Sequence, residues 1–157
     1  MKFQCMRTDL SNAASNVSRA VASKATTPAL EGVLIKAYGS QLEICGYDLE
    51  IGIVTKIDAS VSEEGEIVVS ARLFNEIVRK LPEEIVGIET DDRMITYIHS
   101  GAADYQIIGI SSTEYPELPN VEEISGLTLN AEILKNMIRQ TVFATSDNMA
   151  KIGRAHV

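Results

Sequence analysis

The sequence predicts an α+β fold in which many short strands accompany a few amphipathic helices. Three observations lead to this prediction. Most of the chain alternates apolar and polar residues between turn residues, whereas two segments repeat apolar residues at three- and four-residue steps. The order of a strand followed by a helix, seen at the start, recurs from residue 127.

Composition indicates a globular protein of one domain or slightly more. The chain has 157 residues, of which 45% are hydrophobic and 23% charged. No apolar run reaches the roughly 18 residues of a membrane span, and residues 1–7 do not resemble a signal peptide. Two cysteines, Cys5 and Cys45, are too few for a disulfide framework. They suit a reducing, cytoplasmic location and are most simply buried apolar side chains.

The first half of the chain predicts a strand, a helix and several further strands. Residues 2–6 alternate like a strand, and Thr8 or Asp9 is placed to cap the helix that follows. That helix has an apolar stripe of Leu10, Ala13, Ala14, Val17 and Val21. Strands are then expected at 30–38, 41–45, 49–54 and 66–69, with Gly39-Ser40 as a tight turn between the first two.

The middle of the chain predicts a second helix and three more strands. The helix covers 71–81, where Pro82 ends it, and its apolar side carries Leu73, Phe74, Ile77, Val78 and Leu81. Strands are expected at 84–90, 93–99 and 103–110, with turns at Asp91-Asp92 and Ser100-Gly101. Two prolines in 114–120 indicate a linker.

A second copy of the same domain type is expected after this linker. Residues 127–129 resemble the first strand, and 131–144 resemble the first helix. The sequence therefore predicts a first domain over 1–121 and the beginning of a second over 122–150.

Charge is distributed unevenly between helices and strands. The helical segments 7–24, 72–80 and 131–143 hold eight cations and three acids, a balance of 8 − 3 = +5. Because the net charge is −8, the remainder carries −8 − 5 = −13. Opposite the apolar stripes lie Arg19 on the first helix, Arg72 and Arg79 on the second, and Lys135 and Arg139 on the third. They are either simply solvated or line a surface that meets a phosphate backbone without reading bases.

No pattern of catalytic or metal-binding residues stands out. The only histidines are His99 and His156, and neither has the neighbours of a zinc site. The glycines do not form a phosphate-binding loop, no nucleophile has an evident base, and the acidic pairs fall in predicted turns. We therefore expect no enzyme activity, no cofactor and no metal.

Five stretches of the chain resemble the bacterial beta sliding clamps, the beta subunits of DNA polymerase III. They are TPALEGVLIKA at 27–37, GYDLEIGI at 46–53, VSARLFNEIVRKLP at 69–82, EYPELP at 114–119 and MIRQTVFATS at 137–146. Their order and spacing are those of the family, and the resemblance runs from residue 1 to about residue 150. Tyr47 and Ser70 depart from the family's usual threonine and proline.

The resemblance implies the DNA-clamp fold and a role as a DNA polymerase processivity factor. In this fold, repeated domains each have an antiparallel sheet backed by two helices. Two subunits join head to tail into a homodimeric ring, which encircles double-stranded DNA without sequence preference and tethers the polymerase. By matching position, the residues facing DNA are Lys24, Arg19, Arg72, Arg79 and Lys80 from the first domain, and Lys135 and Arg139 from the second.

The resemblance also implies a subunit interface at strand 103–108. Tyr105 and Ile107 are its expected apolar anchors, although both residues also suit the core of an ordinary strand. The family's pocket for DNA polymerase III and the clamp loader lies between its second and third domains. We expect that pocket to lie outside this chain, and the chain alone to be unable to close a ring.

The last seven residues, KIGRAHV at 151–157, do not continue the family pattern. They match the translation of a common sequencing adapter, so we expect them not to belong to the native protein. A function without DNA remains an alternative for the whole chain: an acidic module for protein–protein interaction. The net charge of −8 favours it, whereas the basic helix faces do not.

Overall fold

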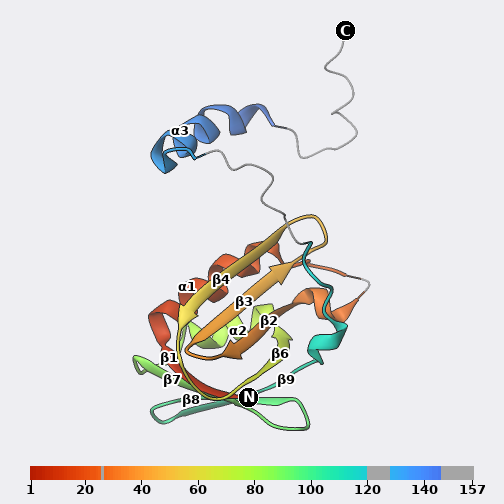
Figure 1. Cartoon of the computed structure of the whole chain (residues 1–157), viewed down its shortest axis with the longest axis vertical. Coiled ribbons are helices and arrows are strands. Elements are labelled where there is room, and N and C mark those ends of the chain that lie inside the picture. Colours follow the sequence, from red (N-terminus) through yellow and green to blue (C-terminus); the bar gives the residue numbers. More distant parts are fainter. Residues whose placement is uncertain (26, 120–127, 146–157) are drawn as a thin grey trace. The chain divides into compact units, whose positions relative to one another are not determined.

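The chain forms two units, Met1–Pro119 and Asn120–Val157. The structure, a computed structural model, describes residues 1–25, 27–119 and 128–145. The first unit contains two antiparallel sheets and two α-helices among the residues described, and the second contains one α-helix (Figure 1). The predicted α+β class, with antiparallel sheets, is confirmed.

One sheet of the first unit has five strands in the order β5-β1-β7-β8-β9. Their bounds are β5 Ser60–Glu63, β1 Lys2–Met6, β7 Ile85–Thr90, β8 Ile95–Ser100 and β9 Ala103–Ile108. All neighbours run antiparallel. Alternating residues of β1, including the fully buried Phe3, face the core, and the residues between them are exposed.

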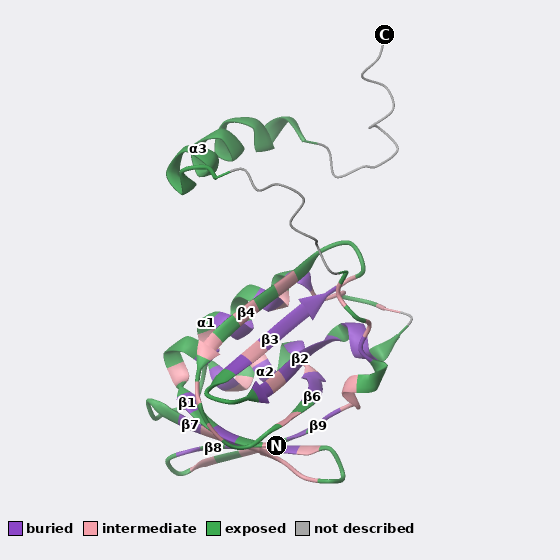
Figure 2. Ribbon diagram, viewed as in Figure 1, coloured by how far each residue is buried: buried purple, intermediate pink, exposed green. Residues whose placement is uncertain are grey.

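The second sheet has four strands in the order β4-β3-β2-β6. Their bounds are β4 Gly52–Asp58, β3 Gln41–Tyr47, β2 Gly32–Tyr38 and β6 Gly65–Ser70. Both faces of the central strands β2 and β3 are largely buried, as the purple ribbons of Figure 2 show. The predicted turn at Gly39-Ser40 joins them, and Gly39 adopts a φ of 59°, which favours glycine.

Helices α1 (Arg7–Val17) and α2 (Ala71–Val78) cover one face of the second sheet and share the main core with both sheets. Leu10, Val17 and Phe74 from these helices are fully buried against strand residues such as Ile35 and Ile44. This burial confirms the stripe of the first helix and most of the second, because the core receives residues at three- and four-residue steps. Two details were wrong: Leu73 is 42% exposed, and α2 ends at Val78, so that Leu81 is buried beyond the helix.

A smaller cluster covers the other face of the second sheet. It consists of Ala29, Leu34, Cys45, Tyr47, Val68 and Tyr115, with Ile110 and Leu118 packed beside them. The segment after β9 therefore crosses this face: Ile110 forms a β-bridge with Val68, and Tyr115 donates a hydrogen bond to the Cys45 carbonyl at 3.4 Å.

The start of α1 differs from the prediction. The helix begins at Arg7 directly after β1, so Thr8 and Asp9 lie inside its first turn and neither caps it. The Arg7 amide donates instead to the Glu84 carbonyl at 2.7 Å, so the neighbouring chain satisfies a helix amide that lacks an internal partner. At the other end, Val21 lies beyond the short helix η1 (Ser18–Ala20), in extended backbone, and still packs on the core.

The predicted strand at 49–54 was wrong in its first half. The carboxylate of Asp48 accepts hydrogen bonds from the amides of Glu50 and Ile51, at 2.9 and 2.7 Å, and Leu49 has a φ of 78°. This turn replaces strand pairing until β4 starts at Gly52. Consequently Leu49 and Ile51 are exposed, despite their apolar alternation.

The second unit is described over residues 128–145. Helix α3 (Ala131–Thr141) and the short helix η4 (Val142–Ala144) confirm the predicted helix over 131–144. Its cap is Asn130, whose side chain accepts from the amides of Glu132 and Ile133. The strand predicted at 127–129 is absent at residues 128 and 129, and Leu127 lies outside the residues described. The tail at 151–157 also lies outside them.

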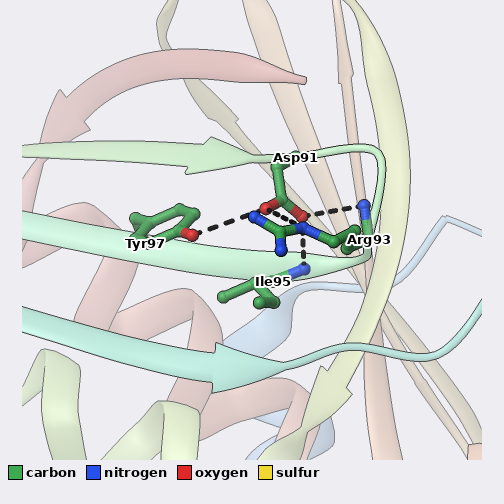
Figure 3. A network of polar contacts seen from close by, with 4 residues as sticks. All are labelled: Asp91, Arg93, Ile95 and Tyr97. Atoms are coloured by element: carbon green, nitrogen blue, oxygen red, sulfur yellow. Dashed lines mark hydrogen bonds and ion pairs between the residues drawn. The ribbon is translucent and has the colours of Figure 1, made fainter.

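The turn between β7 and β8 is organised by one carboxylate, that of Asp91 (Figure 3). It accepts hydrogen bonds from the amides of Arg93 and Ile95, both at 2.9 Å, and from the Tyr97 hydroxyl at 3.4 Å. The Arg93 side chain forms an ion pair with it at 3.7 Å. The Ile95 amide is the largest cause that lowers the pKa of Asp91 below its ordinary 3.8, with smaller contributions from Arg93 and Tyr97.

We expect Asp91→Asn to remove a stabilisation that depends on pH. Because the folded state lowers the pKa of Asp91, its contribution is complete above 3.8 and is lost as the pH falls through the lowered value. Urea unfolding between about pH 7 and about pH 2 should therefore show the two proteins converging in acid. Asp92→Asn, the same change at the exposed neighbour, is the control. Equal destabilisation by Asp91→Asn at every pH would contradict this role.

Candidate nucleic-acid interface

The surface with the predicted DNA-facing residues lies on α1 and α2, on the side away from the core. The two helices pack together, and α2 also contacts η1 at the end of α1. Arg7, at the start of α1, bonds to Leu81, just after α2, so the two helices run in opposite directions. Their outward positions are exposed, as Figure 2 shows for α1.

The structure brings the five predicted cations of the first unit to the ends of this helix pair, and all five side chains are exposed. Arg19 lies in η1, and Lys24 follows it in a loop. Arg72 lies in the first turn of α2, while Arg79 and Lys80 follow its last turn. We refer to Arg19, Lys24, Arg72, Arg79 and Lys80 as the helix cations.

The helix cations differ from most cations of the sheets and their turns in their ion pairing. Among the residues described, none of the helix cations lies within 4.0 Å of a carboxylate oxygen. Of the cations on the sheets and their turns, Lys2, Lys56 and Arg93 each have a partner, at 2.8, 3.2 and 3.7 Å respectively, whereas Lys36 on β2 has none among the residues described. The Lys2 pair raises the pKa of Lys2 and lowers that of Glu89. Three of these four cations are therefore neutralised locally, whereas the positive charge of the helix cations remains available.

Arg7 contributes to the positive charge of this region but does not belong to the exposed surface. Its side chain is half-buried and donates to the Leu81 carbonyl at 3.1 Å. It joins the start of α1 to the segment after α2. We therefore assign Arg7 a structural role, which its charge alone did not reveal.

The other exposed residues of the helix pair are mostly small and neutral. Asn12, Ser15 and Asn16 occupy the outward side of α1, and the acids of the pair are Asp9 and Glu76. Such side chains donate and accept hydrogen bonds without extending far from the helix. This surface is suited to weak contact with a phosphate backbone.

The cations of the second unit lie on α3. Lys135 and Arg139 are exposed there, as predicted. The apolar side of the same helix is exposed as well, with Ile133 60% and Met137 58% accessible. Within residues 128–145, nothing covers that side.

The predicted interface strand, β9, lies at the edge of the five-stranded sheet. Over the described residues, β9 pairs with β8 alone, so its other edge is open. Ile107 is only 4% exposed and belongs to the protein's own core, and Tyr105 packs against that core. Ile108 is 81% exposed. For Ile107 the structure thus favours a role in the protein's own core over a role in a subunit interface. That Tyr105 and Ile107 anchor such an interface stays a prediction.

Other features of the described residues do not indicate chemistry at this surface. Burial raises the pKa of the Cys5 thiol to about 12, and burial likewise raises that of Cys45. Both thiols therefore stay protonated near neutral pH and agree with a packing role. In residues 1–25, 27–119 and 128–145, no three potential metal ligands gather. No helix there is long and apolar enough to span a membrane.

Comparison with known proteins finds one family. A family model described as "DNA polymerase III beta subunit, N-terminal domain" matches residues 1–119. The "Beta sliding clamp" of Bacillus subtilis is 38% identical over 154 residues, which cover 93% of this chain and 41% of the relative. That of Synechococcus elongatus is 40% identical over 154 residues, covering 96% of this chain and 41% of the relative.

Solved structures agree with this family. The crystal structure of the DNA polymerase sliding clamp from Bacillus subtilis matches with a TM-score of 0.92 and 36% identity, covering 96% of this chain and 42% of that one. A putative DNA polymerase III beta subunit from Eubacterium rectale matches with a TM-score of 0.90 and 39% identity, covering 94% and 40%. The chain therefore spans about 41% of the length of the curated relatives described above.

Proposed function

The chain belongs to the DNA polymerase III beta subunit family by its N-terminal domain, and on that premise we propose that it is part of a processivity factor. In this proposal a ring encircles duplex DNA without sequence preference and tethers the replicative polymerase. The observation that carries it is the contrast between the helix cations, none of which has a carboxylate partner among the residues described, and Lys2, Lys56 and Arg93 of the sheets and their turns, which are paired.

The distribution of charge supports a surface that accepts DNA on one side only. The helix cations offer positive charge to phosphates, and such contacts do not depend on base sequence. Outside the helical segments the chain carries −13, by the count given above. That charge repels a polyanion from the sheets and from the loops that join them. Duplex DNA is therefore favoured beside α1 and α2, where the small side chains of Asn12 and Ser15 leave room for it.

The open edge of β9 supports a head-to-tail homodimer. We propose that the partner subunit adds a strand there, with Ile108 as an additional apolar contact beside Tyr105. The polymerase and the clamp loader would bind surfaces beyond the residues described. We further propose that domain I covers 1–121 and domain II begins at 122, that the protein is not an enzyme, and that it acts in the cytoplasm.

Retention on circular DNA tests this function. We expect a chimera, with residues 1–119 in place of the matching domain of the Bacillus subtilis relative, to remain on nicked circular plasmid after loading by that bacterium's clamp loader. Linearisation should release it within minutes, because a ring slides off a free end. Gel filtration of labelled protein with the plasmid measures both.

The unmodified relative is the positive control for loading. Equal retention on circular and linear DNA would indicate ordinary adhesion and contradict encirclement. A correctly folded chimera that is never retained would instead favour the alternative, an acidic module for protein–protein interaction.

A further inference from the structure

A groove of about 490 Å³ lies on the face of the second sheet that is opposite to α1 and α2. Its floor is formed by strands β2, β3, β4 and β6, and one wall is the segment 112–118 that crosses this face. We call this segment the strap and the cavity beside it the strap groove. The strap groove is therefore separated from the helix cations by the sheet and the main core.

The floor of the strap groove has an apolar row that the strap covers incompletely. Cross-strand pairing places Val68, Leu34, Cys45 and Val54 side by side on β6, β2, β3 and β4. Tyr115 packs over the first three, which are at most 8% exposed, whereas Val54 is 45% exposed. An apolar position thus remains open between Val54 and Leu118, which both line the groove.

A charged row runs beside the apolar row. Glu66, Lys36, Glu43 and Lys56 occupy neighbouring positions across the same four strands, so opposite charges alternate. Lys56 pairs with Glu43 at 3.2 Å, and Glu66 accepts a hydrogen bond from Ser112 at 2.6 Å. With two acids and two bases, this row is neutral overall.

Glu117 adds a negative charge that the row does not balance. It is exposed on the strap and lines the groove, and no cation among the described residues lies within 4.0 Å of its carboxylate. The open apolar position and this carboxylate therefore occur in one cavity. Together they specify a ligand with an apolar side chain and a neighbouring positive charge.

We propose that the strap groove docks a short extended peptide segment of another protein, with one apolar side chain between Val54 and Leu118 and an adjacent basic side chain at Glu117. Nucleic acid is a poor occupant, because three carboxylates line the cavity. The groove lies on the face opposite the helices, so a peptide there and DNA at the helix cations do not compete. The proposal needs no DNA and stands independently of the proposed encirclement.

Methyl NMR of the full chain with synthetic peptides tests this proposal. The probe is an acetylated pentapeptide amide with a central leucine, one adjacent arginine, and serine elsewhere. We expect saturable shifts at the methyl groups of Val54, Leu34 and Leu118, with a dissociation constant of roughly 1 mM. Replacing the arginine of the probe by glutamate, or its leucine by serine, should weaken binding about tenfold.

Two matched variants locate the site. Glu117→Lys should weaken binding of the probe about threefold to tenfold, because an attraction at an exposed pair becomes a repulsion. Glu84→Lys makes the same charge change at an exposed residue outside the groove and should leave binding unchanged. Equal weakening by both would show general electrostatic attraction. No saturable shift at Val54 and Leu118 up to about 10 mM peptide, tenfold above the expected constant, would also overturn the proposal.

Discussion

Phe74→Ala should lower the free energy of unfolding by about 3–5 kcal/mol, the range for a large aromatic residue removed from a core. Phe74 is fully buried and belongs to the cluster in which α2 meets both sheets. Alanine leaves a cavity there that neither the helix nor the strands can fill without moving. Urea unfolding of the full chain, followed by far-ultraviolet circular dichroism, measures the loss.

Leu73→Ala is the matched control for this prediction, because Leu73 precedes Phe74 on the same helix but is 42% exposed. Its cost should stay below about 1 kcal/mol, since much less apolar area is buried. If the two variants were destabilised equally, the assignment of Phe74 to the core would be wrong. Phe74 would then not be the side chain that holds α2 against the core. The positions of Arg72 and Arg79, which lie at the two ends of α2, would have to be explained by other contacts.

The chimera of the proposed function should bind DNA with weaker salt dependence when Arg19, Arg72 and Arg79 are all replaced by glutamine. Each phosphate contact contributes about 0.9 to the slope of log affinity against log salt concentration, so the slope should fall by about 3. Binding to a short duplex, measured by fluorescence anisotropy between about 20 and about 200 mM salt, provides this slope.

The control for this prediction removes three sheet cations, Lys2, Lys56 and Arg93, and so changes the net charge equally. Because these cations are paired with Glu89, Glu43 and Asp91, the slope should not change. A similar fall in both variants would mean that the net charge, and not its place on the helices, governs binding. The helix cations would then be solvated residues without a role at DNA.

Local periodicity predicted the elements whose apolar residues enter one shared core. The stripe of α1 at Leu10, Ala13, Ala14 and Val17 is buried, and so is Phe74 of α2. Hydrophobic burial selects a period of 3.6 residues in a helix, and the sequence shows that period directly. The turn at Gly39-Ser40 was predictable for a similar reason, because a positive φ favours glycine.

Other elements depend on contacts that periodicity does not record. Around Leu49 and Ile51, backbone amides donate to the carboxylate of Asp48 and not to a neighbouring strand, so a turn forms where periodicity predicted a strand. Strand β5 was not predicted; its four residues, SVSE, carry little apolar character, and they form a strand because β1 is beside them. The start of α1 is set by the Glu84 carbonyl, which is distant in sequence.

For the candidate surfaces too, periodicity predicted some features, whereas others depend on residues distant in sequence. Helical periodicity predicted that Arg19, Arg72 and Arg79 face away from the core, and the structure places all three on the exposed side, as it does Lys24 and Lys80, which the family resemblance implied. It did not distinguish Arg7, whose role depends on the Leu81 carbonyl across the helix pair. On β9, the adjacent residues Ile107 and Ile108 point to opposite faces of the sheet, and the sequence alone does not say which of them faces the core. The strap groove requires residues from four strands and the strap, so no single segment of sequence predicts it.

Crosslinking from the helix pair tests the central claim, that this surface faces DNA, most directly. Arg72→Cys in the chimera, carrying a photoactivated crosslinker, should attach to circular DNA after loading, whereas Lys56→Cys on β4 should not. Cys5 and Cys45 are buried, so the new thiols are the ones of residues 1–119 that are labelled. DNA attached at position 72 but not at 56 is the predicted result. Attachment at 56 alone, or equally at both, would contradict the account.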